Sequence, residues 1–137
     1  IFSTDHDGHY TLAYDLFKNN PIFGVGPKGF RYFCRSVEYD PPIGICSTHP
    51  HNFLIQILSE TGLFGYMTFF IFILTSLFLS IRNYFIYKNF YQLVALLYVT
   101  IALIPYLPSG SFFSTYASSL FWVNYAIMIS YNKKTKS

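Results

Sequence analysis

The residues best suited to chemistry lie in two short polar segments in the first half of the 137-residue chain. One segment holds His49 and His51 on either side of a proline, and the other contains Lys28, Arg31 and Arg35. An imidazole can take or give a proton near neutral pH, and guanidinium and ammonium groups pair with phosphate oxygens. Together these side chains suit transfer from a phosphate ester, with His51 as the candidate base and the other four as candidate substrate-binding residues.

Three glycines precede the cations. Gly24, Gly26 and Gly29 satisfy the spacing G-x-G-x-x-G, but a dinucleotide fingerprint must sit between a strand and a helix, and Pro27 interrupts this one. Two interpretations stay open. Either the backbone N–H groups of the loop converge on an anion, or the glycines occupy a surface turn that needs positive φ angles.

Pro50 predicts the start of a helix, because proline is favoured at the first helical position. His51 would then lie in the first turn, where the helix dipole disfavours protonation and leaves a neutral imidazole. In an unbroken helix Gly62 and Gly65 would share the face of His51. Glu60 would point to the opposite side, on a polar stripe with three neighbours: Asn52, Gln56 and Ser59. We also count Asn52 as a substrate-binding candidate.

A metal site is not expected. His49 and His51 form an H-x-H pair with no convincing third ligand, which is a weak pattern for zinc.

The composition is unlike that of a soluble domain. Hydrophobic residues make up 53% and aromatic residues 22%, while the chain has only 9 basic and 6 acidic residues. All six acids fall within the first 60 residues. The apolar fraction excludes disorder, and a net charge of +3 without a basic stripe argues against a nucleic-acid partner.

Long uncharged runs predict membrane spans. Residues 61–81 carry no charge, and about 20 residues suffice for a helix to cross a bilayer. The second run, residues 89–132, is too long for one crossing and contains Pro105, Pro108, Ser109 and Gly110. We therefore predict an all-α polytopic membrane protein fragment, with an extramembrane helical segment over residues 1–61 and three spans at about 62–81, 90–107 and 112–131.

The charges flanking the spans predict the orientation. Basic residues without acids occur between the first two spans and in the tail: Arg82, Lys88, Lys133, Lys134 and Lys136. The positive-inside rule places them in the cytoplasm and residues 1–61 outside. Because the chain starts at Ile1 without a signal pattern, we expect upstream sequence and a larger multi-span protein. Outside the cytoplasm Cys34 and Cys46 could form a disulfide or remain two buried thiols.

Two motifs resemble those of a known family. His51, Asn52, Gly62 and Gly65 resemble the pattern His-[Asn/Ser/Gln]-x9-Gly-x2-[Gly/Thr/Tyr] of the O-antigen ligase and O-antigen polymerase family. The segment NPIFGVG, residues 20–26, is similar to the lead-in to that family's large periplasmic loop. The resemblance covers about residues 9–66.

The resemblance implies a glycosyltransferase of the bacterial inner membrane, with residues 1–61 in the periplasm. It implies a polyprenyl-diphosphate-linked saccharide donor, an acceptor that is a saccharide or the lipid A core, and neither cofactor nor metal. His51 would activate the acceptor hydroxyl, and Arg31 or Arg35 would hold the diphosphate. Family members commonly carry an arginine just before the first helix, which is missing here, so His6 or His9 takes part of its role or the donor site is built differently.

Rival functions remain at this point. A polymerase, which we favour slightly, and a ligase are not separated by these residues. A transporter would carry ionisable residues inside its spans, and the two uncharged runs contain none. A non-catalytic protein that binds polysaccharide through its tyrosines is harder to exclude, because aromatic girdles at the membrane interfaces explain most of them equally well.

Overall fold

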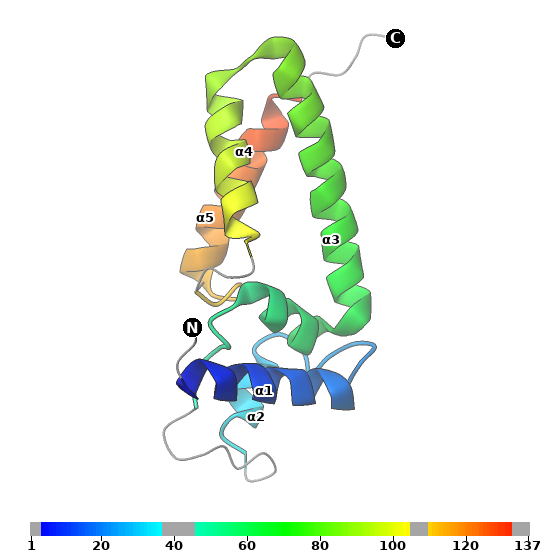
Figure 1. The fold of residues 1–137 in the computed structure, drawn as a ribbon, viewed down its shortest axis with the longest axis vertical. Helices are drawn as coiled ribbons and strands as arrows, with labels where there is room; N and C mark the ends of the chain where they lie inside the picture. The colour runs from blue at the N-terminus through cyan, green and yellow to red at the C-terminus, as the bar shows by residue number, and fades with distance from the viewer. Residues whose placement is uncertain (1–3, 37–45, 105–109, 133–137) are drawn as a thin grey trace.

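The chain is helical throughout the part that the structure describes. The computed structural model describes residues 4–36, 46–104 and 110–132, in which there are five helices and no strand. They are α1 (Thr4–Asn19), α2 (Gly29–Phe33), α3 (Phe53–Tyr87), α4 (Phe90–Ala102) and α5 (Thr115–Ser130). In Figure 1, α1, α2 and the beginning of α3 gather at one end, and the rest of α3 rises beside α4 and α5. The all-α prediction is confirmed.

We call α1, α2 and the beginning of α3 the end region, and this region has its own small core. Leu12, Ala13 and Leu16 are buried on one side of α1, at the spacing expected for an amphipathic helix. They pack against Phe30 of α2 and Cys34, which are also buried. Burial of a large apolar side chain contributes roughly 1.5–3 kcal/mol, so this cluster is what holds α2 against α1.

The start of α3 differs from the prediction. The helix begins at Phe53, not at Pro50, and His51 precedes it with a φ of 56°. Asn52 is the N-cap, because its side-chain Oδ1 accepts hydrogen bonds from the N–H groups of Leu54 and Ile55 at 3.0 and 3.2 Å. Asparagine is among the strongest N-caps, and its capping outweighs the preference of proline for the first helical position. His51 is therefore not in the first turn.

The prediction of an unbroken helix is also wrong. Gly62 has φ 66° and ψ −171°, which breaks α3 into residues 53–61 and a long second part. In an unbroken helix Leu63 N–H would donate to Ser59 O, and Phe64 N–H to Glu60 O. Both bonds are lost at the break. Gly62 and Gly65 consequently do not continue the face of a helix that carries His51.

The loop of residues 20–26 replaces both lost bonds. The loop backbone supplies a donor for each carbonyl that the break leaves without a helical partner. It also supplies an acceptor for each N–H group that the break leaves without one. The four bonds run from Val25 N to Ser59 O (3.1 Å), Gly26 N to Glu60 O (2.8 Å), Leu63 N to Pro21 O (2.8 Å) and Phe64 N to Ile22 O (3.1 Å). A buried backbone group without a partner costs about 1–3 kcal/mol, so the break is tolerable only with this loop in place. We call this set of four bonds the backbone interlock.

Two glycines allow the interlock to form. A Cβ on Gly24 would lie 2.5 Å from the carbonyl carbon of Glu60 and 2.6 Å from the nitrogen of Gly62. A Cβ on Gly62 would in turn lie 2.5 Å from the nitrogen of Gly24 and would overlap the carbonyl of Ile22. Both residues also have positive φ angles. Only glycine fits at either position.

The second part of α3 is long and apolar. At about 1.5 Å per residue, residues 63–87 extend about 37 Å, against about 30 Å for a bilayer core. By length and composition α3 is the one helix, among the described residues, that could cross a membrane. Its outward face exposes large apolar side chains, including Phe64, Met67, Ile71 and Phe78. Continuous exposed apolar surface of this kind fits lipid better than water.

The helices α4 and α5 lie where the other two spans were predicted, but they are short. The apolar α4 has 13 residues and α5 has 16, so crossing by either stays a prediction. The predicted prolines and serine of the intervening turn, and the three tail lysines, lie outside the described residues. In Figure 1 the α3–α4 turn and the end of α5 lie at the end of the molecule opposite α1, as the predicted orientation requires.

Side chains join α3, α4 and α5. An apolar cluster that includes Ile73, Val99 and Met128 fills the space between them. Buried Gln92 of α4 accepts from Asn83 Nδ2 at 3.0 Å and donates to the Met128 carbonyl at 3.2 Å. Such bonds between helices hold a bundle together where water does not compete.

The interlock generates a test with an internal control. Gly24→Ala and Gly62→Ala place a methyl group into backbone, whereas Gly26→Ala at φ 87° meets nothing within 4 Å. Gly26→Ala should lower the free energy of unfolding by only roughly 1–2 kcal/mol, which is the cost of placing an alanine at a positive φ. The other two should unfold at much lower temperature or fail to accumulate, as measured by thermal unfolding of the full-length protein in detergent. Equal stability of Gly24→Ala and Gly26→Ala would contradict the interlock.

Candidate functional site

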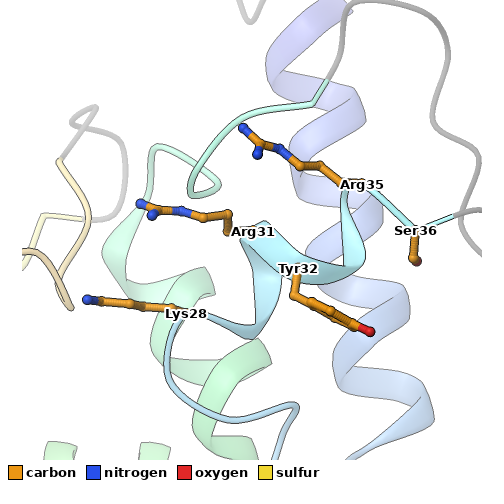
Figure 2. A pocket seen from close by; sticks show the side chains of 5 residues that line it. All are labelled: Lys28, Arg31, Tyr32, Arg35 and Ser36. Atoms are coloured by element: carbon orange, nitrogen blue, oxygen red, sulfur yellow. The ribbon is translucent and has the colours of Figure 1, made fainter.

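The predicted cationic residues share one pocket. It has a volume of about 400 Å³ and is lined by Lys28, Arg31, Tyr32, Arg35 and Ser36. Figure 2 shows the three cationic side chains extending toward one side, while Tyr32 points away from them. Three positive charges on one side of an open pocket suit an anionic ligand with several oxygens.

The cationic cluster surrounds the short helix α2. Lys28 is the N-cap of α2 in the left-handed conformation, Arg31 lies within the helix and Arg35 lies just after it, and all three residues are exposed. Phe30 and Cys34 fall on the opposite face and are buried in the core of the end region. The short helix α2 thus has an apolar side that fixes it and a cationic side that faces solvent.

Glu60 holds the beginning of α2. Its side chain is fully buried, and its carboxylate accepts from Lys28 N–H at 2.7 Å and from Phe30 N–H at 3.3 Å. Gln56 Nε2 donates to the same carboxylate at 3.4 Å. Burial of a carboxylate is tolerable when several donors surround it. The main-chain position of the cations is therefore set by an acid on α3.

The glycine loop accordingly serves a structural purpose. The N–H groups of Val25, Gly26 and Lys28 bind protein oxygens, so the prediction that the loop gathers its donors around a ligand anion is wrong for these groups. The alternative, a turn that needs positive φ, is confirmed for Gly24 and Gly26. Gly29 begins α2, where a Cβ would lie 2.6 Å from Val25 Cγ2. Only the side chains of α2 and Lys28 remain to meet a phosphate.

A row of rings connects the cationic helix with the candidate base. His9 of α1 lies 6.3 Å from Phe30 and 5.5 Å from His51, measured between ring centroids. The His49 ring lies 4.4 Å from that of His51. His9 is buried and His51 half-buried. His9, which was weighed as a substitute for the missing arginine, thus lies beside the candidate base, and the side chain of His6 is outside those that the structure describes.

His51 has an unusual backbone. Its φ of 56° lies in the left-handed region, which non-glycine residues seldom occupy. Its Nε2 lies 3.2 Å from Ser47 Oγ. Such conformations often occur at functional sites, where the surrounding structure holds them in place. Here the fixed Asn52 cap on one side and the Ser47 contact on the other hold the imidazole.

The predicted ligand Asn52 has a structural task. Its Oδ1 caps α3, and the residue is buried. Its role in substrate binding stays a prediction, as does that of His49, whose Nδ1 lies 2.9 Å from Thr48 Oγ1. The predicted polar stripe is real: Asn52, Gln56, Ser59 and Glu60 are all buried.

A disulfide joins the two polar segments. Cys34 and Cys46 are bonded, with Cα atoms 5.5 Å apart. This decides between the two alternatives for the cysteines. Since Cys34 follows α2 and Cys46 directly precedes Ser47, the bond keeps the histidine loop close to the cationic helix.

No metal centre emerges from these side chains. In the part of the chain that the structure describes, no three His, Cys, Asp or Glu side chains are placed to hold a metal ion. The clustered imidazoles contact one another as rings.

Comparison with protein families agrees with this arrangement. Residues 9–70 match the family model Wzy_C, O-Antigen ligase. The resemblance is thereby confirmed over that segment, which includes residues 9–19 of α1, the cationic pocket, the histidine loop and the break in α3. The O-antigen ligases and polymerases of this family are membrane-associated enzymes that act on saccharides. No curated protein and no solved structure matches the chain.

The structure gives a physical reason for the spacing of the O-antigen ligase motif. Asn52 caps the helix that follows His51, and Gly62 ends that helix at the break. The nine residues between them form a helical segment of fixed length, about two and a half turns. The motif therefore sets the distance between the candidate base and the interlock. Gly65 lies one turn past the break, against Thr61.

Three contributors to the site did not stand out in the sequence. The helical periodicity predicts Glu60 on the side opposite His51, no pattern marks Ser47, and His9 is one of two alternatives for the missing arginine. The one available signal for Glu60 was its position, as the last acid before a long uncharged run. Ser47 reaches the site through loop geometry and His9 through the packing of α1, and no local sequence pattern indicates either.

The Glu60 contacts predict a measurable loss of stability. Glu60→Ala removes the acceptor of the buried N–H group of Phe30, at about 1–3 kcal/mol, and of the partly buried N–H group of Lys28, at a smaller cost. The midpoint temperature of thermal unfolding of the full-length protein should therefore fall clearly. Glu60→Gln, which keeps one oxygen, should be milder. Asp15→Asn in α1 is the matched control and should change stability by less than about 0.5 kcal/mol. An unchanged midpoint for Glu60→Ala would refute the assigned role.

Proposed function

We propose that the protein is a membrane glycosyltransferase of surface polysaccharide assembly, which transfers O-antigen-type saccharide from a polyprenyl-diphosphate donor. The observation that carries the proposal is that a tricationic pocket and a half-buried histidine with a left-handed backbone are linked within the segment that matches the O-antigen ligases. The links are the ring contacts of His9 with Phe30 and His51 and the disulfide between Cys34 and Cys46. An anion-binding group and a base are the two parts that this transfer requires.

The donor diphosphate occupies the pocket of α2 in this proposal. Arg31 and Arg35 pair with its oxygens through their forked guanidinium groups, and Lys28 adds a third charge. These charges are more important as the reaction proceeds, because the diphosphate departs with the electron pair of the broken sugar C–O bond. The pocket thus favours the leaving group over the bound donor.

His51 acts on the acceptor. Its imidazole takes the proton of the acceptor hydroxyl as the oxygen bonds to the anomeric carbon of the donor sugar. The proton is then on His51 and the negative charge on the diphosphate, so the step is balanced without a metal or a nucleotide. The left-handed backbone and the neighbouring rings of His9 and His49 orient the imidazole.

A bilayer location suits both substrates. The lipid tail of the donor stays in the membrane, and the pocket lies in the end region from which the apolar part of α3 rises (Figure 1). We propose the bacterial inner membrane, with residues 1–61 in the periplasm and three spans after it. The acceptor distinguishes two versions: a polymerase extends a lipid-linked repeat, which we favour slightly, and a ligase caps the lipid A core or a protein.

His51→Asn tests the base. Asparagine tolerates the left-handed φ of 56° better than other non-glycine residues, so the loop should keep its shape. Without a basic nitrogen, transfer should fall by a factor on the order of 10² to 10⁴ at normal protein levels. The measurement is the amount of polysaccharide made by a deletion strain that carries the full-length variant gene, compared with the same strain carrying the wild-type gene. His49→Asn is the matched variant with a smaller expected loss, and near-normal product from His51→Asn would reject the assignment.

Arg31→Lys tests the diphosphate site. Lysine keeps the charge on this exposed position but loses the forked geometry that fits a diphosphate. The kcat should fall and the apparent KM for donor should rise, while protein accumulation stays normal. Lys18→Ala, at an exposed cation in the last turn of α1, is the control and should be silent. Full activity of the double variant Arg31→Ala, Arg35→Ala would mean that the diphosphate binds elsewhere.

A further inference from the structure

We propose that Ser47 is a positioning residue for His51, whose hydroxyl fixes the imidazole in the tautomer with the proton on Nε2 and the lone pair on Nδ1. The proposal rests on the proposed function of His51 for its catalytic consequence. Its structural part, the tautomer, is argued from the hydrogen bonds of Ser47 and does not depend on the proposed function.

The hydrogen bonds of Ser47 determine the tautomer. Ser47 Oγ lies 2.6 Å from the carbonyl oxygen of His49, which can only accept, so the single hydroxyl proton is directed there. The N–H of His49 donates back to Oγ at 3.2 Å. A hydroxyl oxygen has two lone pairs, and one remains. Because that lone pair faces His51 Nε2 at 3.2 Å, Nε2 must carry a proton.

This contact stays favourable throughout the proposed proton transfer. In the neutral ring Nε2–H donates to Ser47 Oγ, and Nδ1 carries the lone pair. When Nδ1 takes the acceptor proton, the ring becomes a cation and the same Nε2–H donates to Oγ more strongly. Ser47 therefore stabilises the product of the proton transfer more than its starting state, which is the requirement for assisting the step.

The local fold explains why this serine can hold the ring. Cys46, directly before it, is tied to Cys34, and Pro50 limits the backbone directly after His49. The hydroxyl is thus part of a short, doubly anchored loop. Thr48, the neighbouring hydroxyl, is exposed and contacts the His49 ring instead. Two adjacent hydroxyls therefore have different partners, and one can serve as control for the other.

The activity test uses the full-length enzyme with a polyprenyl-diphosphate saccharide donor. Ser47→Ala should lower kcat roughly 10- to 100-fold, the range for loss of a hydrogen bond to a charged group, with the KM for donor unchanged. Ser47→Thr retains the hydroxyl and should restore most of the rate. Thr48→Ala should remain near wild type. A KM effect alone, or failure of Ser47→Thr to exceed Ser47→Ala, would overturn the positioning role.

A second measurement reads the tautomer without activity. Nitrogen-15 spectra of the histidine-labelled full-length protein distinguish protonated from bare ring nitrogens, and the His51 signals are those that disappear in His51→Asn. For the neutral imidazole we expect a protonated Nε2 and an unprotonated Nδ1 in wild type, and a mixture of tautomers in Ser47→Ala. The opposite tautomer in wild type would overturn the proposal.

Failure of the proposed function and failure of the positioning role of Ser47 give different results. If His51→Asn stays active, the proposed function is wrong, and the spectra still decide the tautomer. If His51→Asn is inactive while Ser47→Ala is fully active, the base assignment stands and the role of Ser47 falls.

Discussion

The site depends on the backbone interlock between the loop of residues 20–26 and the break at Gly62. An apolar helix entering a membrane would normally continue straight, and α3 turns because Gly62 leaves helical geometry. The loop supplies hydrogen-bond partners for the two carbonyls and the two N–H groups that the break leaves without helical bonds. Without it, buried polar groups would lose their partners at several kcal/mol in total. The interlock therefore allows one helix to lie partly beside α1 and partly along the bundle.

The same junction determines the chemistry. Glu60, two residues before the break, uses its carbonyl in the interlock and its carboxylate to hold the first N–H groups of α2. Glu60, near the end of the first part of α3, thus sets the position of the pocket cations. On the other side, Asn52 begins that helix and fixes the chain just after His51. A segment of nine residues connects the candidate base with the support of the diphosphate pocket.

The sequence predicted regular features well and irregular ones poorly. Uncharged runs and the periodicity of Leu12, Ala13 and Leu16 led to the helices, because burial of apolar faces follows simple patterns. The start at Pro50 and the unbroken α3 were wrong, since the cap of Asn52 and the partners of Gly62 come from distant or competing contacts. The three cations share one pocket because they lie within eight residues of one another around the short helix α2, and their role in binding stays a prediction. The roles of Glu60 and Ser47 depend on loop geometry, which no residue pattern encodes.

Hydrogen exchange in the full-length membrane protein tests the central claim most directly. If the interlock is the support of the site, the amides of Val25, Gly26, Leu63 and Phe64 should exchange slowly and at a common rate. The amides of Lys28 and Phe30, held by Glu60, should open with them. Exchange of the Val25 and Gly26 amides at the rate of an exposed loop, while α3 remains protected, would contradict the account.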